Sequence, residues 1–300
     1  MSDALVPAPG PVPGPADPVP GLEARTARRE RVRLLLRSPS FIVGSVVILF
    51  WIACAILSDR ITPYHPLFDQ TPDLSEPPSS EHWFGTDRLG RDVFSRVLAG
   101  SREILLVAPL ATLLATIFGT ALGLITGYLR GIADDTISRI IDAVLAIPLI
   151  VLAVTVVAAL GSRSTWAVIV VIAIVFSPII ARTVRAAVLG EAQLDYVEAA
   201  RLRGERASYV MFSEVMPNVM PPILVEATIR LGYAIFAVAT LTFIGFGLQP
   251  PSPDWAVQIA DNYPYLAEEW WTVLFPALAI ASLVVAVNLV SDSVQQVLER

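Results

Sequence analysis

Six apolar stretches, each near the length that spans a lipid bilayer, constrain this chain more than any other feature. They lie at about 41–58, 104–128, 140–160, 165–185, 222–247 and 272–290. A transmembrane helix needs roughly 20 mostly apolar residues, and a helix satisfies its own backbone hydrogen bonds in lipid. Only 16% of the residues are charged, against about 25% in soluble domains. We therefore predict an all-α integral membrane protein with six transmembrane helices.

The distribution of arginine sets the expected orientation in the membrane. All 21 basic residues are Arg. With the N-terminus placed inside, 14 of them fall in inside segments and six in outside loops, while Arg230 lies within the fifth span. Cytoplasmic loops carry an excess of positive residues. We therefore expect both termini to lie in the cytoplasm.

The chain divides into three regions. Residues 1–37 combine seven prolines with a basic segment, "RTARRERVRLLLR", and the Pro-rich part is typical of a disordered tail. Residues 38–103 hold the first helix and a charged outer loop. Residues 104–300 hold a five-helix core, in which the polar segment at about 186–221 faces the cytoplasm.

The residue types exclude several functions. A phosphate loop of the Walker type and Schiff-base chemistry both need Lys, which is absent. Cys54 is the only cysteine, so a zinc site with several Cys ligands and an intrachain disulfide are excluded. His65 and His82 lie in one polar loop, and we interpret both as surface residues. We therefore expect no catalytic residue, metal site or cofactor in this chain.

The polar segment reads as helix, turn and helix. Good helix formers run from Glu191 to Leu202, and Gly204 can adopt the left-handed conformation that ends a helix. Residues 206–215 can form a second helix. Pro217 and the pair 221–222 are expected to stop or bend the chain before the fifth span.

This segment resembles the EAA loop of binding-protein-dependent ABC permeases, which is a Glu-Ala-Ala followed by Gly and later by Pro. The matching positions are Glu198, Ala199, Ala200, Gly204 and Pro217. Glu214 and Met216 stand where the pattern usually has an aliphatic residue and Leu. The resemblance implies that this loop docks on a cytoplasmic ATPase subunit, and the small side chains would let that partner approach closely.

Further stretches resemble the C-type membrane subunits of the peptide/nickel permease family, from about residue 34 to 298. They are "HWFGTDRLGRDVFSRVLAGSR", "RIIDAVLAIP", "YVEAARLRG", "LTFIGFGLQPPSPDW" and "VNLVSDSV". The resemblance implies the fold of an ABC type I importer permease in the bacterial inner membrane. It also implies a heterodimer with a second permease subunit, two ATPase domains that bind ATP and Mg, and an extracytoplasmic solute-binding protein.

The implied cargo is di- or oligopeptides, with nickel, glutathione or haem-type cargo as alternatives within the same family. A self-contained secondary transporter is a rival function. Such proteins often contain two repeats with broken helices, and the sequence shows no such duplication. A membrane-embedded enzyme is a second rival, and the missing Lys and the loop-bound histidines argue against it.

Three charged or polar pairs lie within the predicted spans or at their ends. Glu226 and Arg230 share a helix face at i,i+4 spacing. They either line or gate the translocation path, as intramembrane charges often do, or form a structural pair near the cytoplasmic end. The pair 139 and 142 and the pair 288 and 292 are interpreted as structural.

The predicted outer side carries two further motifs. "GFGLQPPSPDW" is expected to be a rigid turn that contacts a binding protein, caps the outer vestibule or simply re-enters the membrane. Trp255, Trp270 and Trp271 would then be interfacial aromatic residues. In "FGTDRLGRD", the charged residues of 87–92 are expected to form a local salt-bridge network.

Overall fold

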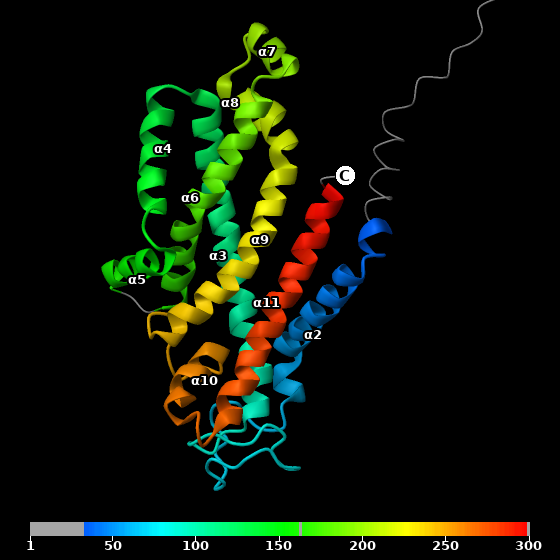
Figure 1. The fold of residues 1–300 in the computed structure, drawn as a ribbon, viewed down its shortest axis with the longest axis vertical. Helices are drawn as coiled ribbons and strands as arrows, with labels where there is room; N and C mark the ends of the chain where they lie inside the picture. Colours follow the sequence, from blue (N-terminus) through cyan, green and yellow to red (C-terminus); the bar gives the residue numbers. More distant parts are fainter. Residues whose placement is uncertain (1–32, 162–163, 299–300) are drawn as a thin grey trace, which may run out of the picture.

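The computed structural model describes residues 33–161 and 164–298, which form a bundle of long helices (Figure 1). The Pro-rich tail that we predicted to be disordered lies within residues 1–32, outside the described part. No β-strand occurs in the described ranges. The elements are α2 (Pro39–Ile61), α3 (Val93–Leu129), α4 (Ile132–Leu145), α5 (Leu149–Leu160), α6 (Thr165–Glu191), α7 (Asp195–Leu202), α8 (Ala207–Tyr209), the π-helix η1 (Val210–Val215), α9 (Met216–Phe243), α10 (Trp255–Asn262), the 3₁₀-helix η2 (Tyr263–Tyr265) and α11 (Trp270–Leu298).

The predicted membrane-protein fold is confirmed. Five described helical segments are long and apolar enough to cross a membrane, and the bent pair of α4 and α5 makes up to six. α7 lies at one end of the bundle, and α10 with the loop that follows α2 lies at the other (Figure 1). The long helices therefore separate two polar ends.

Capping side chains set where several helices begin. The Ser38 hydroxyl accepts a hydrogen bond from Phe41 N (3.5 Å) at the start of α2. The Asp92 carboxylate accepts from Ser95 N (2.8 Å) at the start of α3. Such caps satisfy backbone N–H groups that have no partner within the helix.

The centre of the bundle is a close packing of α3 against α6. Gly119, Gly123 and Gly127 recur every four residues of α3 and face β-branched side chains of α6. A Cβ added to Gly123 would lie 2.6 Å from the Cβ of Val184. Small residues at this spacing let membrane helices approach closely, so the glycines fix the distance between α3 and α6.

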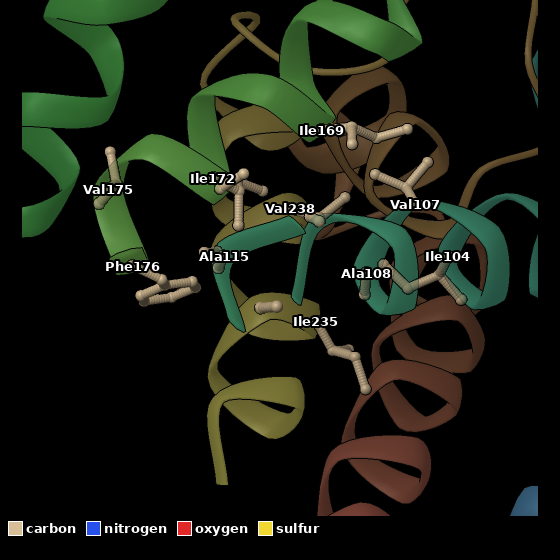
Figure 2. Close-up of a cluster of buried hydrophobic side chains, with 14 of the residues drawn as sticks. Ile104, Val107, Ala108, Ala115, Ile169, Ile172, Val175, Phe176, Ile235 and Val238 are labelled. Atoms are coloured by element: carbon tan, nitrogen blue, oxygen red, sulfur yellow. The ribbon is translucent and has the colours of Figure 1, made fainter. Parts of the chain in front are cut away.

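The apolar core extends this pair to α9. Figure 2 shows Ile104, Val107, Ala108 and Ala115 of α3 near Ile169, Ile172, Val175 and Phe176 of α6, with Ile235 and Val238 of α9 on one side. These side chains are almost fully buried. α3, α6 and α9 therefore form the buried centre of the subunit.

The third predicted span is wrong as a single straight helix. α4 and α5 meet at an angle of 101°, and Pro148 lies at the break as the N-cap of α5. Proline removes a backbone donor and disfavours helical geometry in the residue before it. Residues 132–139, which we expected to belong to a loop, form the first part of α4.

Other helices begin or end at different residues than we predicted, because charged residues that are buried or paired can lie within a helix. α3 begins at Val93, well before position 104, and includes the buried Arg96. α6 continues past Arg182 and Arg185 to Glu191. The segment 186–221, predicted as a polar connection between two spans, is therefore mostly helical. Its first helix was expected to start at Glu191, whereas α7 begins at Asp195.

Candidate functional site

α7 is a short amphipathic helix at one end of the bundle (Figure 1). Val197 and Ala200 point inward and are fully buried, whereas Glu198 and Ala199 are exposed. This corrects the expectation that both alanines are available to a partner. Ala200 packs within the subunit because it shares the inward face of α7 with Val197, and only Ala199 can meet another surface.

Gly204 ends α7 in the left-handed conformation predicted from the sequence, with φ +79°. Its N–H donates to Arg201 O (2.9 Å), and the N–H of Glu205 donates to Ala200 O (3.3 Å). These two bonds form a Schellman motif. A Cβ added to Gly204 would meet no atom within 4 Å, so a larger residue is opposed by backbone strain and not by a clash.

Tyr196 fastens α7 to the helices on both sides. Its hydroxyl donates to Glu191 Oε1 at the end of α6 (2.6 Å) and accepts from Asn218 Nδ2 near the start of α9 (2.8 Å). Burial and the adjacent Glu191 carboxylate raise the pKa of Tyr196 to about 12. The hydroxyl therefore stays protonated at neutral pH and keeps both contacts.

Two arginines add exposed contacts around α7. Arg201 Nε donates to the Tyr128 hydroxyl at the end of α3 (3.2 Å), and its guanidinium lies 4.8 Å from the Tyr128 ring centroid. Arg203 pairs with Glu214 at 3.7 Å. Exposed pairs of this kind contribute only about 0–1 kcal/mol. Tyr196 and the buried face of α7 therefore provide most of the interactions that hold this helix in place.

Of the two outcomes expected for the prolines after α7, a stop or a bend, the stop does not occur. The π-helix η1 leads directly into α9, which contains Pro217 in its first turn and continues through residues 221–222. A proline in a first helical turn costs little, because its missing N–H would have no intrahelical partner there. Pro217 is exposed and follows the turn that carries Glu214.

Sequence reasoning missed three exposed apolar side chains close to this segment. Leu202 is 83% exposed at the end of α7, and Tyr209 and Phe212 are 48% and 59% exposed in the turn that follows. Because charged residues surround these side chains, they form no periodic apolar pattern in the sequence. A small cavity of about 400 Å³ beside α7 is lined in part by Glu198, Arg201 and Leu202.

Glu226 and Arg230 form the predicted pair within α9. Arg230 Nε donates to Glu226 Oε1 at 2.6 Å, and the guanidinium lies 5.1 Å from the Tyr233 ring centroid. Both side chains are largely buried within the subunit. The geometry accounts for them as a satisfied ion pair, and a role in the path stays a prediction.

Of the residues 139 and 142 that we interpreted as structural, Asp142 pairs with α6, and Asp134 of the same helix also does so. Asp142 lies 3.6 Å from Arg182. Asp134 accepts two hydrogen bonds from Arg185, at 2.7 and 2.8 Å. Arg182 and Arg185 of α6 therefore attach α4 to α6.

The opposite end of the bundle contains the predicted salt-bridge network, in a different form. Asp87 Oδ2 accepts from Arg91 Nε (2.7 Å) and from Arg96 (2.6 Å). Asp92 instead caps α3 and lies 2.9 Å from His82 Nδ1. His82 is only 2% exposed, so the expectation of a surface histidine is wrong for His82, whereas His65 is exposed.

Two of the three predicted interfacial tryptophans are structural. Trp255 Nε1 donates to Val97 O (2.7 Å) and Trp271 Nε1 donates to Thr86 O (3.0 Å), and both side chains are buried. Trp270 is 47% exposed. Trp255, the last residue of "GFGLQPPSPDW", therefore packs against α3 and fixes the start of α10 there. Contact of this segment with a binding protein stays a prediction.

Within the described residues, no three His, Cys, Asp or Glu side chains are grouped as metal ligands would be. The polar groups of the α7 end can bind a protein surface through hydrogen bonds, exposed charge and apolar contact. They contain no arrangement of nucleophile and base.

Comparisons with known proteins agree with this architecture. The family model described as "Binding-protein-dependent transport system inner membrane component" matches residues 119–300. A probable D,D-dipeptide transport system permease protein of Escherichia coli, DdpC, is 37% identical over 93% of this chain and 94% of its own.

Two other relatives cover similar lengths. A dipeptide transport system permease protein of Alkalihalophilus pseudofirmus is 37% identical, over 90% of this chain and 89% of its own. A glutathione transport system permease protein of Pectobacterium atrosepticum is 38% identical, over 92% and 91%. An inward-facing structure of the MetNI methionine ABC transporter matches with a TM-score of 0.56 at 22% identity, over 68% of this chain and 97% of that one. The last likeness concerns the fold.

Proposed function

Because this chain belongs to the family of binding-protein-dependent transport system inner membrane components, we propose that it imports peptides together with a second permease subunit. The chain is a multi-pass inner membrane protein and a permease subunit of an ABC importer. In the proposed assembly, the path lies between the two permeases. Two ATPase domains supply the energy, and an extracytoplasmic binding protein delivers the cargo.

The α7 end is the proposed docking site for an ATPase subunit. Glu198, Ala199, Gly204 and Pro217 contribute to this surface, while the buried Ala200 supports α7 from below. The exposed Leu202 adds apolar area that a protein partner would cover. The single observation that supports this proposal is that α7, exposed on one face, follows α6 after three residues and leads through α8 and η1 into α9.

The proposed orientation puts α7 and both termini in the cytoplasm. The excess of Arg in segments on that side supports it. A cysteine introduced at Ser208 should resist an impermeant thiol reagent applied from outside, whereas one at Ser79 should react. Reaction at Ser208 alone would invert the topology.

The proposed cargo is a di- or oligopeptide. The names of relatives that align over most of their length concern D,D-dipeptides and dipeptides. Glutathione, itself a peptide, is the cargo in the name of an equally similar relative, and it remains the alternative that these comparisons favour.

Gly204→Val tests the coupling role of α7. Val is disfavoured at positive φ by about 1–2 kcal/mol, so the cap of α7 should deform while the bundle stays intact. We expect normal insertion, at least a roughly tenfold loss of ATP-driven uptake, and ATP hydrolysis that no longer depends on cargo-loaded binding protein. Uptake and hydrolysis are measured on the full transporter in proteoliposomes.

Gly161→Val is the matched control. Gly161 also follows a helix with a positive φ, +62°, and open space around its added Cβ, but it ends α5, away from α7 (Figure 1). We expect uptake per inserted complex to stay near that of the wild type. Normal coupled transport by Gly204→Val would refute the docking assignment.

A further inference from the structure

A cavity of about 530 Å³ lies between α9 and α11, and none of the features described above uses it. The two helices run side by side along the bundle (Figure 1). Gly232 and Tyr233 of α9 line one wall, and Asn288, Ser291 and Asp292 of α11 line the other. Three neighbouring polar side chains on one membrane-spanning helix therefore face one space.

Ser291 is the first sign that this space is made for a ligand. The residue is only 2% exposed, and its Oγ has no hydrogen-bond partner within the described residues. Buried hydroxyl groups in proteins are almost always paired, because an unpaired one loses its hydration without compensation. Ser291 is one of the residues that line the cavity, so a polar group of a ligand that reached its Oγ would supply the missing partner.

Asp292 gives the cavity an uncompensated negative charge. Its side chain is exposed, and no ion pair or hydrogen bond holds it within the described part of the chain. Arg230 on the facing helix is already paired with Glu226 at 2.6 Å. A carboxylate on a spanning helix is costly against lipid, so the open side of the cavity faces water or protein.

The absence of a side chain at Gly232 leaves room for Asn288, the third polar residue of the cavity. A Cβ added to Gly232 would lie 2.5 Å from Asn288 Oδ1. A glycine at this point of α9 therefore lets the Asn288 amide sit against the facing backbone. The exposed ring of Tyr233 (56%) borders the same space with an aromatic face.

We propose that this cavity binds the ammonium group of the cargo, which for a peptide is its amino terminus. This inference rests on the proposed function. The Asp292 carboxylate, the Asn288 carbonyl oxygen and Ser291 Oγ are three acceptors for the three N–H donors of an ammonium. The volume lies within the roughly 300–1,000 Å³ of small-ligand sites.

The test measures binding of radiolabelled dialanine to the purified full transporter in nanodiscs, without its binding protein. We expect Asp292→Asn to weaken binding about tenfold or more and Ser291→Ala to weaken it a few fold, since the ligand loses a charged and a neutral acceptor, respectively. N-acetyl-dialanine, which lacks the ammonium, should bind the wild type as weakly as dialanine binds Asp292→Asn. Asp292→Glu keeps the charge and should restore most of the affinity.

Asp135→Asn is the matched control, because it removes an exposed carboxylate from α4, far in sequence from the cavity, and should leave binding unchanged. If Asp292→Asn fails to assemble, Ser291→Ala carries the test. Equal binding of dialanine by wild type and variants, or no binding by a wild type that transports peptide, overturns the inference alone. A wild type that takes up no peptide with its binding protein overturns the proposed function instead.

Discussion

At the α10 end of the bundle, charged side chains are buried and paired, whereas the charged side chains that hold α7 are exposed and lightly held. Arg96 is 1% exposed and bonds to Asp87 at 2.6 Å. Arg203 at the other end is 56% exposed and lies 3.7 Å from Glu214. Breaking a buried pair costs several kcal/mol, while an exposed one contributes about 0–1 kcal/mol.

This difference indicates that the α10 end is held more rigidly than α7. Trp255 and Trp271 add buried hydrogen bonds to the α10 end, so that end is fixed to the start of α3. α7 is held by the small buried patch of Val197 and Ala200 and by Tyr196. A surface that meets a moving partner benefits from this lighter attachment.

The largest effect is expected from Arg96→Ala, which would leave Asp87 buried with one of its two arginines. We expect a loss of about 3–5 kcal/mol in the free energy of unfolding, measured as a fall in the thermal midpoint of the detergent-purified complex. Arg182→Ala, which removes a guanidinium that is 68% exposed, is the control and should change the midpoint little. Similar shifts for both variants would break the contrast between buried and exposed charges.

A smaller effect is expected from pH at Asp254, the N-cap of α10. Burial raises the pKa of Asp254 from 3.8 to about 6. Because the folded state binds this proton more tightly, the associated stability is present below about pH 4 and is lost as the pH rises through about 6, amounting to roughly 3 kcal/mol at most.

Asp254→Asn checks this expectation, because an amide oxygen can accept the same bonds from Ala256 N and Val257 N and does not titrate. The thermal midpoint of the wild type relative to the variant should fall between about pH 4 and pH 7. A constant difference across that range would show that Asp254 ionises in the folded protein as it does in water.

The smallest effect is expected from Tyr196→Phe, which removes the hydroxyl that joins α6 and α9 to α7. We expect a local loss of about 0.5–1.5 kcal/mol, visible as faster hydrogen exchange in α7 with an unchanged global midpoint. Tyr209→Phe is the control, since the 48% exposed Tyr209 side chain lies in the following turn. Unchanged exchange in α7 would mean that Tyr196 is not its tether.

The sequence predicted the spans and the end of α7 well, since both follow from local chemistry. Apolar length defines α2 and α11, and Gly204 has the left-handed conformation expected of a glycine after a helix. The break at Pro148 was also visible in local sequence, and the prediction was wrong because apolar length outweighed the proline there.

Tertiary pairing explains what the sequence could not predict. A lone histidine such as His82 looks like a surface residue until Asp92, ten residues away, packs against it. Trp255 looks interfacial until Val97 O, 158 residues away, accepts its N–H. The inward face of Ala200 likewise depends on where α7 settles against the bundle, which the Glu-Ala-Ala order does not reveal.

The close packing at Gly119, Gly123 and Gly127 makes α3 and α6 behave as one rigid unit. A sliding of one helix along the other would drive Cα atoms of α3 into Ile180, Val184 or Val188, so the pair moves together. α7 follows α6 after only three residues, and α3 begins at the buried charges around Asp92 at the far end. Under the proposed docking role, a push on α7 would therefore reach the far end of the bundle as a tilt of this helix pair.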